Sequence, residues 1–187
     1  MRYEPITEKP YCCVPSVLQM VEIRRGVTVF SQDDIGYELG LIVPPEVASQ
    51  FKKVQTGAEP RAGYGTQTSK NEFSIELFFS RHHPEFNFKR TMPATLSEHR
   101  QILEQCESPD ADIIICYNSQ KLFGDGDPEH ASLIESFDIT NDRVVIVDPA
   151  IGAPKLREAS SEKLFMVLRS HELSNIAGFW IVSTRRQ

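Results

Sequence analysis

Apolar residues recur at helical spacing through the first half of the chain, and this pattern predicts a series of helices. Pro15 suits the first turn of the first helix, and Gly26 stops it. Ser31 is a good N-cap for the second helix, whose first turn holds Asp33 and Asp34, where the helix dipole favours negative charge. The expected helices cover about residues 14–25, 32–40, 45–51, 71–81 and 97–106.

The second half of the chain carries short runs of apolar and β-branched residues, which predict strands. Residues 140–142 have the composition of a hairpin turn. One more helix is expected from Ser160 or Ser161 to about residue 170. The expected strands are residues 86–91, 112–117, 130–139, 143–147 and 179–182. Helices that come first and an antiparallel sheet that comes later indicate the α+β class.

A single domain is expected over residues 1–187, since this length suits one substantial hydrophobic core. Residues 52–70 differ from the rest, because they contain three glycines and a proline and have no hydrophobic period. We expect them to form a mobile surface loop, since long loops are often either functional or mobile.

Composition and charge exclude several classes of protein. The formal net charge is −6 and the pI is about 5.4, which argues against nucleic-acid binding, since that requires a basic face. No apolar run approaches the roughly 20 residues that span a bilayer, and the N-terminus lacks the apolar stretch of a signal peptide. We therefore expect a cytoplasmic protein that binds neither nucleic acid nor a membrane.

The cysteines are expected to be free thiols, and we expect no metal or cofactor. Their spacing fits neither a disulfide framework nor a CxxC zinc motif. They are Cys12, Cys13, Cys106 and Cys116. The acidic run at residues 125–130 has oxygen ligands that suit a hard cation such as calcium. It lacks the twelve-residue calcium-loop pattern, however, and a solvated acidic loop is the simpler interpretation.

The candidate catalytic residues are Cys13, His130 and Asp148. Cys13 lies just before a predicted helix, whose N-terminal N–H groups and dipole favour a thiolate, the form that attacks a carbonyl. His130 starts one strand of the expected hairpin and Asp148 follows the other, and a carboxylate beside an imidazole orients it. The simplest register leaves them misaligned, so we expect a bulge or a longer turn. The structural alternatives are a small core cysteine, a surface histidine and a turn aspartate.

Two segments of the chain resemble the corresponding stretches of a known family. Residues 13–21 read CVPSVLQMV, similar to CGPAALAMV in the C39-like peptidases, and only Cys13, not Cys12, gives this register. Residues 130–138 read HASLIESFD and residues 144–149 read VVIVDP, which resemble that family's histidine strand and its Asp-Pro ending. The resemblance implies a papain-like fold, with N-terminal helices packed on a C-terminal antiparallel sheet. It also implies a triad of nucleophile, base and orienting carboxylate.

The chain departs from the family pattern at two places. The family carries a glutamine about six residues before the cysteine as an oxyanion donor, whereas this chain has Ile6, Thr7 and Glu8 in that region. Besides the Cys13 backbone N–H, the oxyanion candidates are Thr7, Gln67 and Asn118. The second departure is Val14, where the family has glycine.

These observations predict a cysteine hydrolase, either a C39-like peptidase or an amidase. Cys13 would attack an amide or peptide bond, form a thioester and release it to water, with His130 as base. A peptide or protein substrate is expected, and Cys12 is the fallback nucleophile. The alternative is a catalytically silent papain-like fold that acts as a protein-binding or regulatory module, because fold does not imply activity.

Overall fold

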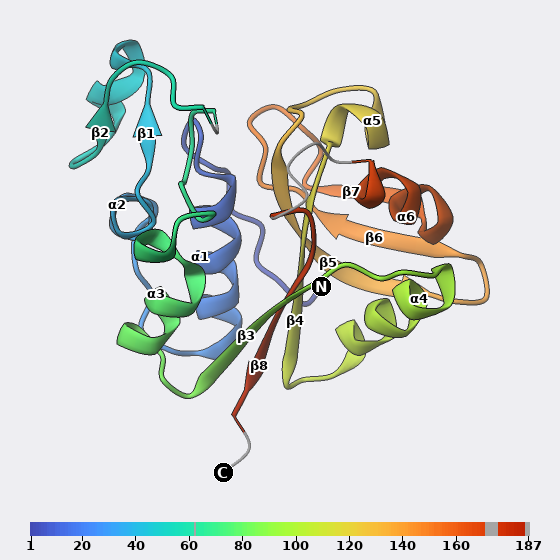
Figure 1. The fold of residues 1–187 in the computed structure, drawn as a ribbon. Coiled ribbons are helices and arrows are strands. Elements are labelled where there is room, and N and C mark those ends of the chain that lie inside the picture. The colour runs from blue at the N-terminus through green and yellow to red at the C-terminus, as the bar shows by residue number, and fades with distance from the viewer. Residues whose placement is uncertain (62, 171–175, 186–187) are drawn as a thin grey trace.

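The computed structural model describes residues 1–61, 63–170 and 176–185, which form a sheet with helices on both of its faces (Figure 1). The helices are α1 (Cys13–Arg25), α2 (Gln32–Glu38), α3 (Ile75–His82), α4 (Leu96–Glu104), α5 (Ser119–Phe123) and α6 (Ser161–Arg169). Short 3-10 segments cover Pro45–Gln50, Asn71–Phe73 and Gln105–Glu107. None of the described helices is long and apolar enough to cross a membrane.

The central sheet is antiparallel at every neighbouring pair of strands and has the order β3-β8-β4-β5-β6-β7. Its strands are β3 (Phe86–Thr91), β4 (Ala111–Tyr117), β5 (His130–Asp138), β6 (Arg143–Val147), β7 (Leu156–Ser160) and β8 (Gly178–Thr184). A separate pair, β1 (Ile42–Val43) and β2 (Gln55–Thr56), runs parallel beside α2 (Figure 1). Helices followed by an antiparallel sheet confirm the α+β class.

Both faces of the sheet are buried, which explains the continuous apolar run in β4. Successive side chains of a strand point to opposite faces. Accordingly, Ile114 packs with α1 and α3 on one face, whereas Ile113 packs with α4 and α6 on the other. On the first face, Leu18 and Trp180 are almost completely buried, and their packing fixes α1 against the sheet.

Several short elements differ from the sequence expectation. Strand β7 was missed because it is an edge strand with a half-exposed pattern, and Leu156 is 44% exposed. The segment Pro45–Gln50 is a 3-10 rather than an α-helix. Helix α3 starts later than expected because the Ser74 hydroxyl caps it by accepting from the Leu77 N–H. Residues 52–70 are not wholly irregular, since they contain β2; their mobility stays a prediction.

The β5–β6 hairpin contains a bulge, one of the two irregularities that the sequence predicts. Near the turn Ser136 lies opposite Val145, but farther along Ile134 lies opposite Ile146, so Glu135 is an extra residue in β5. This one-residue shift changes which side of the sheet each later residue of β6 faces relative to β5. Without it, Asp148 would lie opposite Leu133 and therefore on the face away from the His130 side chain. The bulge thus places Asp148 and His130 on one face.

Candidate active site

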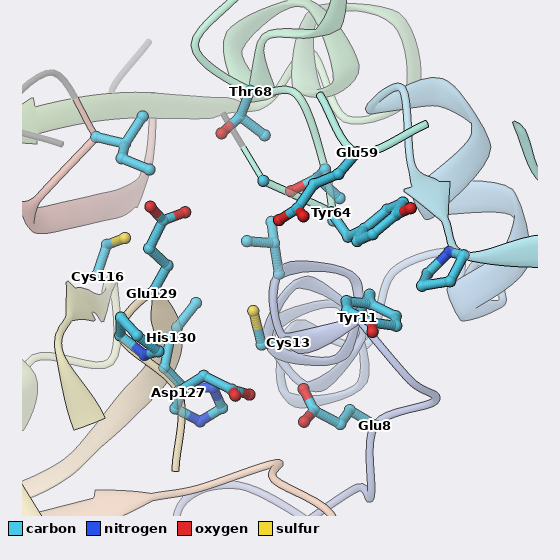
Figure 2. Close-up of a pocket in the computed structure, with 18 of the residues that line it drawn as sticks. Glu8, Tyr11, Cys13, Glu59, Tyr64, Thr68, Cys116, Asp127, Glu129 and His130 are labelled. Atoms are coloured by element: carbon cyan, nitrogen blue, oxygen red, sulfur yellow. The ribbon is translucent and has the colours of Figure 1, made fainter. Parts of the chain in front are cut away.

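A cavity of about 560 Å³ lies between the N-terminal end of α1 and the start of β5. Figure 2 shows Cys13, His130 and the carboxylates of Glu8, Asp127 and Glu129 around this space. The segment that the sequence predicts as a loop supplies another wall. Its lining residues are Glu59, Gly63, Tyr64, Gly65, Thr66 and Thr68.

Cys13 is the first residue of α1 and contributes its side chain to the cavity. Its backbone N–H donates to no acceptor among the described residues, as expected at a helix N-terminus, where the first N–H groups have no partner within the helix. Cys12 is fully buried and packs with Leu41 and Val43 instead. Of the two adjacent thiols, the structure therefore brings only Cys13 to the cavity.

His130 and Asp148 form a buried pair at the end of the hairpin. The Nε2 atom of His130 lies 2.7 Å from Oδ1 of Asp148, and both side chains are at most 3% exposed. A carboxylate only accepts hydrogen bonds, so Nε2–H is the donor. The Ala150 N–H also donates to Oδ1 at 2.9 Å, and Arg157 contacts Oδ2 at 3.4 Å. These contacts fix the carboxylate and leave Nδ1 as the ring nitrogen that Asp148 does not engage.

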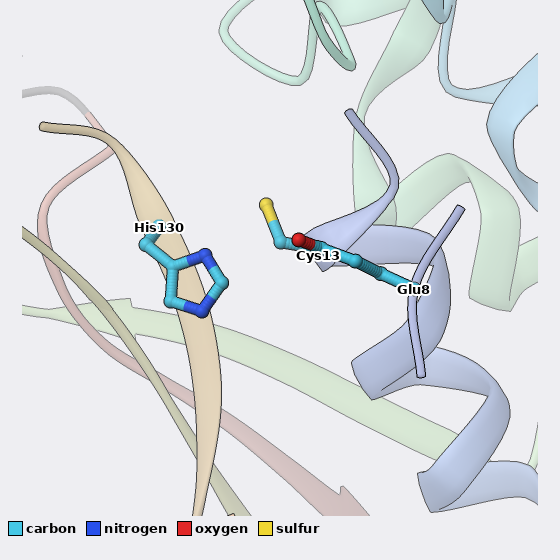
Figure 3. Close-up of side chains that lie close together, drawn as sticks. All are labelled: Glu8, Cys13 and His130. Carbon is cyan, nitrogen blue, oxygen red and sulfur yellow. The ribbon is translucent and has the colours of Figure 1, made fainter. Parts of the chain in front are cut away.

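Three reactive side chains converge at the N-terminal end of α1. One ring nitrogen of His130, the Cys13 sulfur and a carboxylate oxygen of Glu8 all lie within 4.8 Å of one another. Figure 3 shows Cys13 at the start of the helix, between His130 on β5 and Glu8 on the segment that precedes the helix. The predicted nucleophile and base are therefore brought together, with a carboxylate beside them to which the sequence analysis gave no role.

The environment affects the acidity of these groups in opposite directions. Burial raises the pKa of the Cys13 thiol well above its ordinary value, and the Glu8 carboxylate adds to this effect. The lowering of this pKa that the helix position predicts is therefore wrong, chiefly because the thiol is buried. Burial opposes the ionisation of Asp148, but the hydrogen bond and charge of His130 outweigh it and hold the pKa of Asp148 below its ordinary value.

The predicted side-chain oxyanion donors are not brought to the cavity. The Thr7 side chain is exposed. Gln67 is buried, and its amide nitrogen donates to the carbonyls of Gly63 and Gly65. Asn118 caps α5 by accepting from the Lys121 N–H. None of the three lines the cavity, whereas Glu8, which also lies in the region where the family carries its glutamine, does so.

The three converging groups are of types that bind zinc, but their spacing does not define a metal site. Two ligands of one tetrahedral zinc ion lie about 3.5 Å apart, given bonds of about 2.0–2.3 Å. The ligand atoms of Glu8, Cys13 and His130 lie within 4.8 Å of one another, a wider limit than this ligand–ligand distance. We therefore do not identify Glu8, Cys13 and His130 as metal ligands.

Sequence reasoning missed several cavity residues because their signals are weak. Tyr11 adopts a left-handed backbone conformation with φ of 63°, and its ring lies 5.6 Å from that of Tyr64, across the cavity wall. Cys116 on β4 contributes a second, largely buried thiol. Only Glu8 could have been found from the sequence, because it lies five residues before the predicted nucleophile, close to where the family carries its glutamine.

Solved structures share this fold, although no family model and no curated protein sequence matches the chain. The peptidase domain of Streptococcus ComA, a bifunctional ABC transporter involved in a quorum-sensing pathway, is 14% identical with a TM-score of 0.55 over 98% of this chain and 99% of that one. A candidate C39-like peptidase from Bacillus anthracis is 15% identical with a TM-score of 0.61 over 98% and 95%. The chain therefore has the papain-like fold of C39 peptidases, as the sequence resemblance implies.

Proposed function

We propose that the protein is a cysteine hydrolase that cleaves an amide or peptide bond through Cys13, His130 and Asp148. The observation that carries this proposal is the convergence of the Cys13 sulfur and a His130 ring nitrogen within 4.8 Å, together with the hydrogen bond of 2.7 Å between His130 Nε2 and Asp148. Nucleophile, base and orienting group in this chain of contacts are the elements of acyl transfer.

The reaction follows from the roles of these three side chains. His130 takes the Cys13 proton while the sulfur attacks the carbonyl carbon, and the carbonyl electron pair moves to oxygen. Collapse of this tetrahedral intermediate breaks the carbon–nitrogen bond, and His130 gives its proton to the leaving amine. Water, deprotonated by His130, then hydrolyses the thioester and regenerates the thiol. The Cys13 backbone N–H supports the oxyanion in both steps.

A peptide or protein segment fits the proposed site best. The cavity of about 560 Å³ is in the size range of sites that enclose part of a small substrate. Its lining combines the rings of Tyr11, Tyr64 and Trp180 with acidic side chains. Nucleic acid is not proposed as a partner, because a phosphate backbone would be repelled by such a lining.

One observation favours the second candidate, a catalytically silent module that binds a protein partner. An ionised Glu8 beside Cys13 opposes both the thiolate and a developing oxyanion. A chain that kept Glu8 ionised at all working pH values would bind peptide in the cavity without cleaving it.

A defined mixture of synthetic peptides, analysed by mass spectrometry after incubation with the protein, separates the two candidates. We expect cleavage by wild type and by Cys12→Ala, which removes the neighbouring thiol outside the cavity, and none by Cys13→Ala. Circular dichroism would check that each variant folds. Cleavage that persists in Cys13→Ala would refute the proposed nucleophile, and peptide binding without cleavage between about pH 5 and about pH 8 would favour the silent module.

A further inference from the structure

We propose that Glu8, in its protonated form, is the side-chain oxyanion donor of this site, so that its proton switches the acylation step on. The inference rests on the proposed hydrolase function and deepens it. A protonated carboxyl group carries one O–H donor, as an amide carries N–H donors, whereas an ionised carboxylate can only accept.

The geometry of Glu8 fits this role. One of its carboxylate oxygens lies within 4.8 Å of both the Cys13 sulfur and a His130 ring nitrogen. The Glu8 backbone N–H donates to the Pro149 carbonyl at 2.9 Å, which ties this residue to the segment that follows Asp148. Its Oε2 atom is buried and has no hydrogen-bond partner among the described residues. A buried polar atom without a partner is costly, and an oxyanion would supply the missing partner of an Oε2–H group.

Burial, modified by the surrounding charges, places the titration of Glu8 in the physiological range. Burial raises the pKa of Glu8 to about 7; His130 and Lys155 lower it, and Asp148 and Asp127 raise it. Glu8 in turn raises the pKa of the neighbouring thiols. The ionisable groups that act on Glu8 or respond to it are therefore Cys12, Cys13, Asp127, His130, Asp148 and Lys155.

Protonation of Glu8 has two favourable consequences for acyl transfer. It removes the negative charge that disfavours the Cys13 thiolate, and it adds a donor beside the carbon that the sulfur attacks. As the pH rises through about 7, Glu8 ionises and both advantages are lost. Only the second advantage concerns the oxyanion, so an experiment has to separate it from the effect on the thiolate.

Two probes of Cys13 make this separation, with mass spectrometry to locate the label. Iodoacetamide alkylates the thiolate by displacement and forms no oxyanion, whereas p-nitrophenyl acetate acetylates it through a tetrahedral oxyanion. Both rates contain the same fraction of thiolate, so the ratio of acetylation to alkylation at Cys13 reports oxyanion stabilisation. The ratio is measured from about pH 5.5 to about pH 8.5, on either side of the raised pKa of about 7 of Glu8.

We expect the wild-type ratio to fall by about 20- to 30-fold across this range, because loss of one oxyanion donor typically costs about 10²–10³ in rate and the protonated fraction of a carboxyl group with a pKa of about 7 falls by about thirtyfold. In Glu8→Gln the ratio should be high and independent of pH, because an amide donates at every pH. In Glu8→Ala it should be low throughout. Asp127→Asn, the matched charge control, should keep the fall but shift its midpoint to lower pH, since Asp127 raises the pKa of Glu8.

A wild-type ratio that does not change with pH, or a Glu8→Gln ratio that still falls, would overturn the inference. These outcomes differ from failure of the hydrolase proposal, in which p-nitrophenyl acetate leaves Cys13 unlabelled in wild type and in Glu8→Gln while iodoacetamide still alkylates it.

Discussion

Asp148 has a testable role at the scale of single residues, because its Oδ1 atom accepts from His130 at 2.7 Å within a buried site. Asp148→Asn retains an oxygen acceptor for Nε2–H but loses the negative charge, so we expect Cys13-dependent peptide cleavage to fall, though less than in Asp148→Ala. Asp148→Ala loses the acceptor as well, and we expect a loss of about a hundredfold or more. Initial rates on a cleaved peptide measure both losses. Equal rates in the two variants would show that the hydrogen bond does not orient His130.

The three candidate catalytic residues could be selected from the sequence, whereas the ionisation states of their side chains could not. Cys13, His130 and Asp148 stood at recognisable places, a helix start and two ends of a hairpin. The pKa of Cys13 depends on burial and on Glu8, neither of which a linear pattern contains. A donor role for Glu8 could not be predicted either, because a carboxyl group donates only when it is protonated, and burial raises the pKa of Glu8 only in the folded protein.

His99 allows a prediction at the scale of elements, because it lies in the layer that joins α4 to the sheet and α6. Its ring packs 5.0 Å from that of Phe179 and 5.5 Å from that of Phe165. Burial, followed by the charge of Arg100, lowers the pKa of His99 to about 4 from 6.5. In the unfolded chain His99 therefore binds a proton at higher pH than in the folded protein. The contribution of neutral His99 to the free energy of unfolding is lost as the pH falls from 6.5 towards 4.

The comparison with His99→Phe isolates this contribution, because other buried groups such as Glu22, whose pKa burial raises to about 8, titrate in the opposite sense. Between pH 7 and about pH 4.5, wild type should lose about 1–3 kcal/mol of stability relative to His99→Phe. Urea unfolding at the two pH values measures this difference. A difference in free energy of unfolding that does not change with pH would show that His99 titrates normally.

Helices and strands could be predicted where the hydrophobic pattern was strong. They could not be predicted where an element forms only through its contacts with other elements. Strands β4 and β6 matched their apolar runs closely, because both are buried. Strand β7 was missed because it is an edge strand whose residues are exposed or only partly buried. The need to align His130 with Asp148 predicted a bulge or a longer turn, but the place of the bulge at Glu135 could not be read, because no glycine or proline marks it.

At the scale of the whole molecule, the acidic cavity predicts a preference for cationic peptides. Its lining includes acidic residues and, within the described chain, neither lysine nor arginine. The acidic residues are Glu8, Glu46, Glu59, Asp127 and Glu129. Together with a formal net charge of −6, they create a negative field that attracts positive ligands. Cleaved members of the peptide mixture should be enriched in lysine or arginine.

Added sodium chloride is the control for this preference, because salt screens exposed charges. The enrichment should weaken from low salt to about 1 M, where the screening length falls to about 3 Å. Equal cleavage of acidic and basic peptides at low salt would contradict an electrostatic contribution to specificity.

The central claim is that His130 activates Cys13 for attack on a carbonyl. The most direct measurement is the rate at which p-nitrophenyl acetate acetylates Cys13 at about pH 6, followed by mass spectrometry in wild type and in His130→Ala. We predict an acetyl group on Cys13 in wild type and a rate lower by about 10²–10⁴ in His130→Ala, the usual contribution of a positioned base. Equal rates in the two proteins, or an acetyl group on other residues alone, would contradict the account.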